Sequence, residues 1–375
     1  MLTAVNDSEI NLNLNKLKNI SIDANWEESN MSNKNETEQI LRENNKRFVL
    51  FPIEYNQIWE SYKNSEARFW SAEEVELSDD AEDFNHLTGK EKATILQILS
   101  VLVKNGSLLG TDIFKRFNTD VQAAEARAAF GFQIMQTNIH TELFSVLLEL
   151  FLDGADGDYL IETINELPSD SRKEAWIASN ILESQDDFAT RLTCLAVYFK
   201  LFLSTPAVVL IHFQKENVLP GLIRSISKVY RDWMGYYKFA ILLLQHLTSI
   251  PSQNKVEEII REAISIEEMV LTDISNLSGG NLFINGADLN LIFLKNYIRQ
   301  MGRKALLDLG YAEEGILFEN DLVGEDLDFV ERLENMLEAE ARKDDNESDY
   351  PIKQSSLAQK SVVSDHRTFS LDDDF

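Results

Sequence analysis

The residues of this chain that could serve metal chemistry are few, and His140 is the first of them. A helical bundle that holds two metal ions presents two Glu-x-x-His pairs and two further carboxylates to its interior, because residues three apart share a helix face. The nearest spacing here is Thr137-x-x-His140, within the stretch FGFQIMQTNIHTELF (Phe130–Phe144). A threonine takes the place of the carboxylate, and no Glu-x-x-His occurs anywhere in the sequence. The histidine is therefore present without the anionic partner that such a site needs.

The single cysteine limits the other chemistry that the chain could perform. Cys194 has no second cysteine to pair with, which excludes an intrachain disulfide, a thiolate metal cluster and a dithiol redox couple. It lies in an apolar run, where a cysteine packs as a small hydrophobic side chain. The remaining histidines show no metal-ligand spacing: His86, His212, His246 and His366. A lone reduced thiol fits an intracellular, cytoplasmic protein.

The charge of the chain excludes two broad classes of partner. Its 375 residues include 35 Lys and Arg against 63 Asp and Glu, a formal charge of −28. Phosphates and anionic membranes both attract basic chains, so we expect neither a nucleic acid nor a membrane as partner. The first residues lack a basic region followed by an apolar one, so no secretory signal is predicted. The apolar run Leu192–Phe213 contains Lys200 and Pro206 and is predicted to be a buried bundle helix rather than a membrane span.

Helical periodicity dominates the rest of the chain. Only 15 Gly and 6 Pro occur, and apolar residues recur at helical rather than alternating spacing, so an all-α bundle is predicted. Thr88 and Glu91 form a capping box that starts one long helix. The predicted long helices are Thr88–Phe117, Val121–Leu152, Asp186–Phe213, Gly221–Ser249, Glu257–Ser275 and Asp288–Leu307. Shorter helices are predicted at Tyr159–Leu167, Ser171–Leu182 and Leu327–Leu337.

Composition divides the chain into three parts. Residues 1–45 include 11 Asn and have no sustained apolar period, which is typical of a disordered tail. Residues 46–341 hold the predicted helical bundle. From residue 342 to residue 375 the sequence becomes polar and irregular, and we expect a second, flexible tail that ends in FSLDDDF.

Several segments together resemble the small subunit of class I ribonucleotide reductase. They are RFVLFPIEYNQIW, EARFWSAEEVELSDD, EARAAFGFQIMQTNIHTELFSVLLE, VLPGL, Arg231-Asp232 and the acidic, Phe-ended FSLDDDF. These segments stand in the family's order and cover about Arg47–Phe375. The resemblance implies a ferritin-like four-helix bundle core with additional helices. It also implies a diiron or related dimetal centre that oxidises a tyrosine, whose radical passes to a large subunit for deoxyribonucleotide synthesis and hence DNA replication.

The positions that bear the family's metal ligands depart from its pattern. Carried over one by one, the family's first-helix aspartate falls on Gly106, and its first Glu-x-x-His pair falls on Thr137 and His140. Its lone glutamate falls on Phe199, and its second Glu-x-x-His pair falls on Trp233 and Tyr236. Among them only His140 is a ligand of the family's type. The radical tyrosine falls on Phe144, which has no phenolic O–H to oxidise.

The chemistry of these replacements argues against a metal centre as well. Two di- or trivalent ions need several anionic oxygens, and hard cations prefer carboxylates. The large aromatic residues at positions 199, 233 and 236 would fill the site with side-chain packing instead. The sequence therefore resembles a paralogue that has lost its metal ligands, and we expect no cofactor.

Three other positions match the family. Trp70, His140 and Asp232 fall on its internal relay, in which a tryptophan, a histidine and an aspartate are hydrogen-bonded. Two interpretations stay open. The three residues are either a surviving path for electrons and protons or a buried polar triad in which each member satisfies the others.

The acidic end also has two interpretations. The resemblance implies a peptide that docks in a groove of the large subunit, with Phe369, Leu371 and Phe375 as apolar anchors and Asp374 among its charges. A disordered acidic end without a partner is the alternative.

The sequence as a whole predicts a non-catalytic auxiliary small subunit of ribonucleoside-diphosphate reductase. It would form a heterodimer through the bundle face with a metal- and radical-bearing small subunit, and lend its tail to the large subunit. One alternative is a ferritin-like oxidoreductase that binds metal independently through a shifted ligand set. Glu142 and Glu149 lie on the helix of His140, but Glu142 points roughly away from that histidine. A repurposed helical adaptor is the other alternative.

Overall fold

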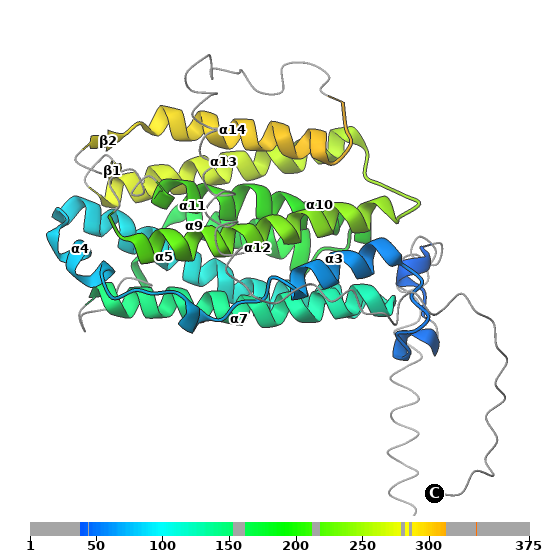
Figure 1. Ribbon diagram of the computed structural model, residues 1–375. Coiled ribbons are helices and arrows are strands. Elements are labelled where there is room, and N and C mark those ends of the chain that lie inside the picture. The colour runs from blue at the N-terminus through cyan, green and yellow to red at the C-terminus, as the bar shows by residue number, and fades with distance from the viewer. Residues whose placement is uncertain are drawn as a thin grey trace, which may run out of the picture.

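The helices of the chain lie side by side in layers (Figure 1). This computed structural model describes residues 38–43, 45–152, 162–211, 218–278, 282–284, 287–312 and Asn335. One outer layer consists of α13 (Gln253–Leu277) and α14 (Leu291–Asp308). The middle layer consists of α5 (Gly89–Leu108), α10 (Phe188–Val197), α11 (Ser204–Ile211) and α12 (Pro220–Gln245). The opposite side consists of α3 (Asn56–Glu66) and α7 (Ala124–Leu152). The protein is an all-α, ferritin-like bundle with additional helices, as the sequence predicted.

Two of the middle helices begin at residues suited to a helix start. The backbone N–H of Glu91 donates to the hydroxyl of Thr88, and the carboxylate of Glu91 accepts the N–H of Thr88 at 2.8 Å, so the predicted capping box forms. Helix α5 then continues through the π-helical segment η4 (Leu109–Ile113) into α6 (Phe114–Asp120). Pro220 stands in the first turn of α12, where its missing N–H is not needed.

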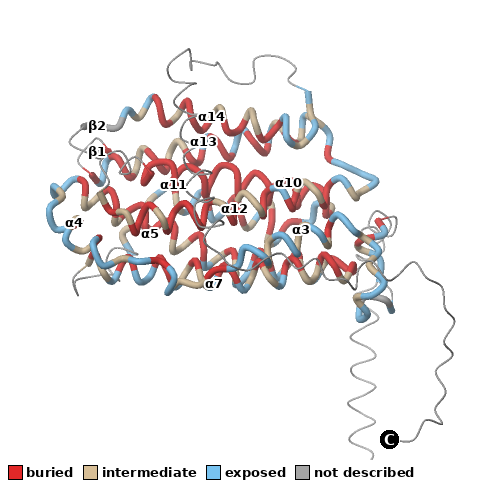
Figure 2. The backbone as a smooth tube through the Cα atoms, viewed as in Figure 1, coloured by how far each residue is buried: buried red, intermediate tan, exposed pale blue. Residues whose placement is uncertain are grey.

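The most deeply buried run of the chain passes through the middle of the bundle. Helix α10 continues through the π-helical segment η6 (Tyr198–Leu203) into α11, and every residue of this run is buried (Figure 2). By length and composition alone, Phe188–Ile211 and Gly89–Asp120 are each apolar enough to cross a membrane. Because neighbouring helices bury the most apolar window of Phe188–Ile211 completely, this run is the core helix that the sequence predicted.

Shorter elements complete the described part. They are α4 (Asp80–His86), α9 (Pro168–Ile177), the π-helical η5 (Ala178–Leu182) and the 3-10 turns η1 (Gln39–Leu41), η2 (Asn45–Phe48) and η3 (Ala72–Glu74). Helix α9 begins three residues before the predicted start at Ser171, with a proline in its first turn. The helix predicted at Tyr159–Leu167 is described from Glu162 onward. The helix predicted at Leu327–Leu337 lies outside the described residues except for Asn335.

A two-stranded antiparallel hairpin, which the sequence did not predict, precedes α14. Its strands are β1 (Leu282–Ile284) and β2 (Ala287–Leu289). The prediction that a helix begins at Asp288 was therefore wrong, because that residue lies in β2. The helix begins only after Asn290, whose side-chain oxygen accepts the backbone N–H of Ile292 at 2.9 Å and so caps it.

The segment before the expected boundary at residue 46 contributes to the bundle. Glu38 is buried, and its carboxylate accepts the backbone N–H groups of Thr248 and Ser249 at 2.8 Å and 3.0 Å. The carbonyl oxygen of Ile40 accepts the N–H of Gln122 at 2.8 Å. These bonds tie the segment to the connections that follow α12 and α6, so the described structure begins earlier than the expected boundary.

The carboxylate of Asp80 fixes the start of α12, the helix that carries Asp232. It is buried and accepts the backbone N–H groups of Gly221 at 2.8 Å and Leu222 at 2.5 Å. Negative charge at a helix amino terminus complements the helix dipole. A Cβ atom at Gly221 would lie 2.6 Å from the carbonyl oxygen of Glu76, so only glycine allows this close approach.

Candidate functional site

A buried carboxylate joins three separate segments of the chain at one point. The Oδ2 atom of Asp232 accepts a hydrogen bond from Nε1 of Trp70 at 2.9 Å and lies 2.9 Å from Nε2 of His140. Asp232 is on α12, His140 is on α7, and Trp70 lies between α3 and η3. All three side chains are buried, and the rings of Trp70 and His140 stack with their centroids 5.6 Å apart. The structure thus brings together the three residues that the resemblance assigned to a relay.

Two further residues extend this polar cluster: Gln136, which the sequence analysis missed, and Tyr236, which it named only as a position of a lost metal ligand. Nε2 of Gln136 donates to the same Oδ2 of Asp232 at 3.2 Å, and Oε1 of Gln136 accepts the hydroxyl hydrogen of Tyr236 at 3.0 Å. Gln136 precedes His140 by one turn of α7, and Tyr236 follows Asp232 by one turn of α12. Polar residues four apart on two facing helices were the sequence signal that could have predicted this cluster.

The contact between His140 and Asp232 determines the tautomer of the histidine ring. A carboxylate oxygen only accepts hydrogen bonds, so the contact with Asp232 assigns the ring proton to Nε2. The other ring nitrogen, Nδ1, is buried and has no hydrogen-bond partner among the described residues. A metal-binding histidine usually has one nitrogen bonded to a carboxylate or carbonyl and the other turned to the ion. His140 therefore keeps the orientation of a metal ligand.

Aromatic rings occupy three of the positions where the resemblance places metal ligands. The rings of Phe199 and Tyr236 meet edge to face with centroids 5.7 Å apart, and Phe114 lies within 5.9 Å of both. The ring of Trp233 packs on Phe144 with centroids 6.2 Å apart. All five side chains are buried. Their packing fills this part of the bundle with carbon atoms that cannot bind a cation as ligands.

The two small residues at ligand positions supply no anionic oxygen. The hydroxyl of Thr137 donates to the carbonyl oxygen of Gln133 at 2.8 Å, within its own helix. A Cβ atom at Gly106 would meet the hydroxyl oxygen of Thr141 at 3.4 Å, an ordinary contact distance. The hydroxyl of Thr141 therefore lies beside Gly106, and a longer acidic side chain at this position would have to extend past it.

The phenol of Tyr236 stays protonated in this setting. Burial, together with the negative charge of Asp232, raises the pKa of Tyr236 well above its ordinary value. The hydroxyl is therefore a hydrogen-bond donor to Gln136 rather than an anionic oxygen that could balance the charge of a metal ion.

A dimetal centre does not fit these residues. Of the positions that the resemblance assigns to ligands, only His140 offers a metal-binding atom, its Nδ1. Across the described ranges, no three His, Cys, Asp or Glu side chains gather closely enough to hold a metal ion. A shifted ligand set is not supported either, because Glu142 and Glu149 are both exposed rather than turned toward the cluster.

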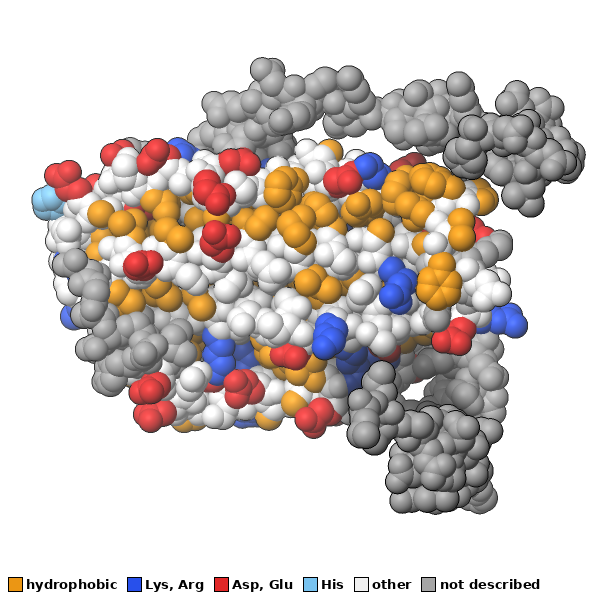
Figure 3. Space-filling view, turned by 90° about the horizontal axis from the view of Figure 1, so that it is seen from below, with side chains coloured by type: hydrophobic (Ala, Val, Ile, Leu, Met, Phe, Trp, Pro, Cys, Tyr) orange, Lys and Arg blue, Asp and Glu red, His pale blue; other side chains and the backbone are white. Residues whose placement is uncertain are grey.

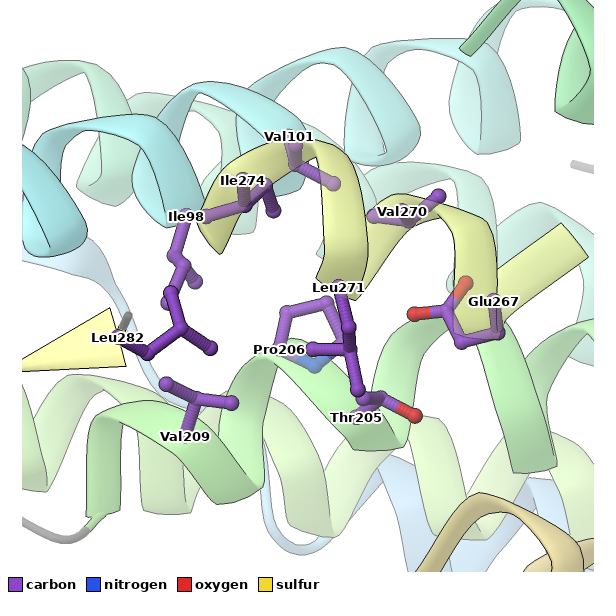
Figure 4. A pocket seen from close by; sticks show the side chains of 10 residues that line it. All are labelled: Ile98, Val101, Thr205, Pro206, Val209, Glu267, Val270, Leu271, Ile274 and Leu282. Atoms are coloured by element: carbon purple, nitrogen blue, oxygen red, sulfur yellow. The ribbon is translucent and has the colours of Figure 1, made fainter. Parts of the chain in front are cut away.

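A buried ion pair lies apart from this cluster. Nζ of Lys173 is 2.8 Å from Oε2 of Glu267, at angles outside those of a hydrogen bond, and both side chains are buried. Burial raises the pKa of Glu267, although the charge of Lys173 opposes this effect. Glu267 borders a cavity of about 10 Å³ between α5, α11 and α13, lined otherwise mainly by aliphatic side chains (Figure 4). That volume holds about one water molecule, so the cavity is too small for a ligand.

The residues predicted to bind a partner lie outside the described residues. They are Phe369, Leu371, Asp374 and Phe375.

Comparison with protein families and curated proteins gives one consistent result. The family described as "Ribonucleotide reductase, small chain" matches residues 47–314. Ribonucleoside-diphosphate reductase subunit M2 of Mesocricetus auratus is 34% identical over 277 residues, which cover 74% of this chain and 70% of that protein. The ribonucleoside-diphosphate reductase small chain of Neurospora crassa is 37% identical over 275 residues, which cover 73% of this chain and 65% of that protein.

Solved structures share the same architecture. The ribonucleotide reductase Rnr4 homodimer of Saccharomyces cerevisiae superposes with a TM-score of 0.69 at 28% identity, covering 85% of this chain and 99% of that chain. The ribonucleotide reductase R2 subunit of Clostridium botulinum superposes with a TM-score of 0.64 over 75% of this chain and 88% of that chain. At 14% identity, the second similarity shows the fold alone.

Proposed function

The chain belongs to the ribonucleotide reductase small-chain family, and we propose that within it the chain is an auxiliary subunit without its own dimetal centre or tyrosyl radical. In this role it pairs with a metal- and radical-bearing small subunit and docks the large subunit of ribonucleoside-diphosphate reductase. It supplies structure to an assembly that makes deoxyribonucleotides, and the chemistry takes place in its partners.

The hydrogen bond between Tyr236 and Gln136 is the observation that carries this proposal. It joins α12 to α7 at a position where the resemblance places a metal ligand, and it continues to Asp232 through the amide of Gln136. A protonated phenol, an amide and a carboxylate satisfy one another here without a cation. The bond supports a core that folds and persists without metal.

The residue at the radical position supports the same role. Phe144 is a buried hydrocarbon ring packed on Trp233, with no O–H to give up as a hydrogen atom. With no radical to transmit, we assign Trp70, His140 and Asp232 to the structural role. They tie α7, α12 and the segment after α3 together.

We place the pairing surface on the α3–α7 side of the bundle. Met135 and Val146 of α7 are 37% and 44% exposed, and Phe69 is 49% exposed. Phe69 and Tyr62 both lie against the ring of Phe132, with centroids 6.5 Å and 5.9 Å apart. Figure 3 views the molecule from this side and shows hydrophobic side chains along its length. Exposed apolar side chains gathered on one face are typical of a protein interface, and a small subunit of the same fold would cover them.

We assign the docking of the large subunit to residues 342–375, which the composition of the sequence predicts to be a tail. The support for this assignment is the sequence FSLDDDF, with Phe369, Leu371 and Phe375 as anchors and Asp374 among the charges. We place the complex in the cytoplasm, where the lone Cys194 stays reduced.

A reconstitution assay tests the proposed function. The purified chain, a competent small subunit and the large subunit are combined in pairs and all together, and the reduction of a ribonucleoside diphosphate is measured. We expect no activity from this chain with the large subunit alone, and activity when the competent subunit is added. Native mass spectrometry is expected to detect a heterodimer of the two small subunits. Turnover without the competent subunit would contradict the proposal. Failure to bind either partner would favour the adaptor alternative.

A further inference from the structure

A lysine of α12 lies over the ring of Trp70. Nζ of Lys228 is 5.4 Å from the ring centroid, within the range of a cation–π interaction. Both residues are buried, since Lys228 is 6% exposed and Trp70 is 3% exposed. Lys228 precedes Asp232 by one turn of α12, and Nε1 of Trp70 donates to Oδ2 of Asp232 at 2.9 Å. The indole therefore has a cation over its face and an anion at its N–H.

A second cation lies at the other oxygen of this carboxylate. Nε of Arg231 is 3.7 Å from Oδ1 of Asp232, and the side chain of Arg231 is 12% exposed. Oδ2 accepts hydrogen bonds from Trp70 and Gln136 and lies 2.9 Å from Nε2 of His140. The carboxylate is thus engaged at both oxygens, and the hydrogen bond from Trp70 to Asp232 has a cation near each of its ends.

One-electron oxidation of Trp70 would add a positive charge at this site. Tryptophan loses an electron more readily than most side chains do, and a carboxylate at the indole N–H favours the loss because it can accept the proton. When the electron leaves, the new charge is on the ring, 5.4 Å from the ammonium group of Lys228. When the proton then moves from Nε1 to Oδ2, Asp232 becomes neutral and Arg231 loses the negative charge beside it. Both oxidised forms of Trp70 are therefore destabilised by these cations.

We propose that Lys228 keeps Trp70 reduced, so that this chain does not consume the oxidising equivalent of a radical-bearing subunit beside it. This inference rests on the proposed function, which brings the chain next to a protein radical. In the reaction that Lys228 opposes, a one-electron oxidant accepts the electron of Trp70, and the indole proton passes to Oδ2 of Asp232. The hydrogen bonds of the triad hold the helices together, and the ammonium group over the ring disfavours the oxidation that the same hydrogen bonds would otherwise assist.

The burial of Lys228 makes its charge effective. At 5.4 Å, two unit charges change an equilibrium by about two orders of magnitude when the effective dielectric constant is about 20. Trp59 provides a contrast, because Nζ of Lys63 lies 5.8 Å from its ring centroid. The side chain of Lys63 is 46% exposed and forms an ion pair with Glu66, so water and a counter-charge screen it. The effect on oxidation is therefore expected at Trp70 rather than at Trp59.

Photo-oxidation of the full-length chain tests this inference. A photogenerated ruthenium(III) tris-bipyridine complex accepts one electron from a tryptophan, and peptide mass spectrometry measures the oxidised indole at each position. Lys228→Met removes the charge and keeps an unbranched side chain. We expect it to increase the oxidation of Trp70 at least about fivefold relative to that of Trp176, because the charge acts through a buried, low-dielectric region. Trp176 is a buried tryptophan on α9 and serves as the internal reference.

Two further variants separate the charge of Lys228 from its packing. Lys228→Arg keeps a cation over the ring and is expected to oxidise at Trp70 as the unmodified chain does. Lys63→Met changes the net charge by the same amount as Lys228→Met, at an exposed lysine that also lies over a tryptophan. It is expected to leave the oxidation of Trp70 unchanged, which controls for the attraction of the cationic ruthenium complex to the acidic chain.

Three results would overturn the inference. The first is equal oxidation of Trp70 in Lys228→Met and in the unmodified chain. The second is an equal increase in Lys228→Met and Lys228→Arg, since the charge would then have no part in the effect. The third is an increase that Trp176 shares, because a loosened fold rather than a removed charge would then expose the buried tryptophans.

The same samples separate this inference from the proposed function. Photo-oxidation needs only this chain, whereas native mass spectrometry of the chain mixed with a competent small subunit detects the heterodimer. Heterodimer formation without a selective increase at Trp70 rejects only the role of Lys228. A selective increase at Trp70 without a heterodimer supports the effect of Lys228 on oxidation and rejects the proposed pairing.

Discussion

The hydroxyl of Tyr236 donates a hydrogen bond to Oε1 of Gln136 at 3.0 Å. The two residues belong to facing helices, α12 and α7, and Nε2 of Gln136 donates a second hydrogen bond to Asp232. Tyr236 occupies a position where the resemblance places a histidine ligand. In a metal-binding relative an ion would connect the two helices there, whereas here two neutral side chains connect them. The stability of the bundle is therefore expected to depend on these side chains.

Removal of the Tyr236 hydroxyl tests this dependence. Tyr236→Phe is expected to lower the free energy of unfolding by about 1–3 kcal/mol, because the buried Oε1 of Gln136 loses its donor. Chemical denaturation measures the change. The control is Tyr62→Phe, whose hydroxyl binds Glu66 one turn away on the same helix. Its effect is expected to stay within about 0.5 kcal/mol. Equal effects of the two substitutions would show that the Tyr236 bond is not needed.

The hydrogen bonds among Trp70, His140 and Asp232 predict that substitution of Asp232 lowers the stability more than substitution of His140. His140→Ala is expected to lower the free energy of unfolding by about 1–3 kcal/mol, because Asp232 loses one of its donors. Asp232→Ala is expected to cost more, because Trp70, Gln136 and His140 all donate to its Oδ2. Urea denaturation of both variants gives the comparison. The reverse order, or an unchanged midpoint for His140→Ala, would mean that the carboxylate is not the centre of the cluster.

Substitution by alanine is expected to change the free energy of unfolding in opposite directions at Gly106 and at Gly221. At Gly106 the added Cβ meets Thr141 at 3.4 Å, and a glycine inside a helix is unfavourable, so Gly106→Ala is expected to raise the free energy of unfolding by about 0.5–1 kcal/mol. At Gly221 the added Cβ would lie 2.6 Å from the carbonyl oxygen of Glu76, so Gly221→Ala is expected to destabilise the protein. Thermal denaturation distinguishes the two. Destabilisation by Gly106→Ala would mean that the packing around this position is tighter than the structure indicates.

The ion pair between Lys173 and Glu267 predicts strong coupling between two substitutions. Either Lys173→Met or Glu267→Met alone is expected to lower the free energy of unfolding by about 3–5 kcal/mol, because it leaves one buried charge uncompensated. The double variant is expected to be close to the unmodified protein, since two apolar side chains replace two desolvated charges. A double-mutant cycle measures the coupling. Additive single effects would contradict a direct pairing in the core.

The raised pKa of Glu267 sets the pH dependence of this pair. In the folded state its pKa lies above the ordinary value of 4.5, so between the two values the folded protein binds more protons than the unfolded chain. The free energy of unfolding therefore falls as the pH rises through that range. Lys173→Met with Glu267→Met removes the effect, so the double variant is expected to gain stability relative to the unmodified chain as the pH rises from 4.5. A pH-independent difference would contradict the raised pKa.

The sequence predicted the helices well where a single local signal dominated. The capping box at Thr88 and Glu91 forms, and the apolar run around Leu192 is a core helix. The hairpin before α14 was missed, because strands of three residues are too short to establish an alternating pattern. The contacts of Glu38 with Thr248 and Ser249 were not predicted, because these residues are more than 200 positions away in the sequence.

The candidate site was only partly visible in the sequence. The resemblance named Trp70, His140 and Asp232, and the structure brings them within hydrogen-bonding distance. It did not name Gln136, because this residue belongs to no ligand pattern and its role depends on a partner on another helix. The contact between Tyr236 and Gln136 comes from the packing of α7 against α12, and spacing along either helix alone does not specify it.

The metal content of the purified chain after incubation with Fe(II) and oxygen, measured by elemental analysis, tests the central claim most directly. The account predicts less than about a tenth of an equivalent of iron or manganese, because one histidine nitrogen without carboxylates does not hold a hard cation. About two equivalents, the load of a dimetal site, would contradict it. In that case the ligands would have to come from residues other than those at His140, Thr137 and Tyr236.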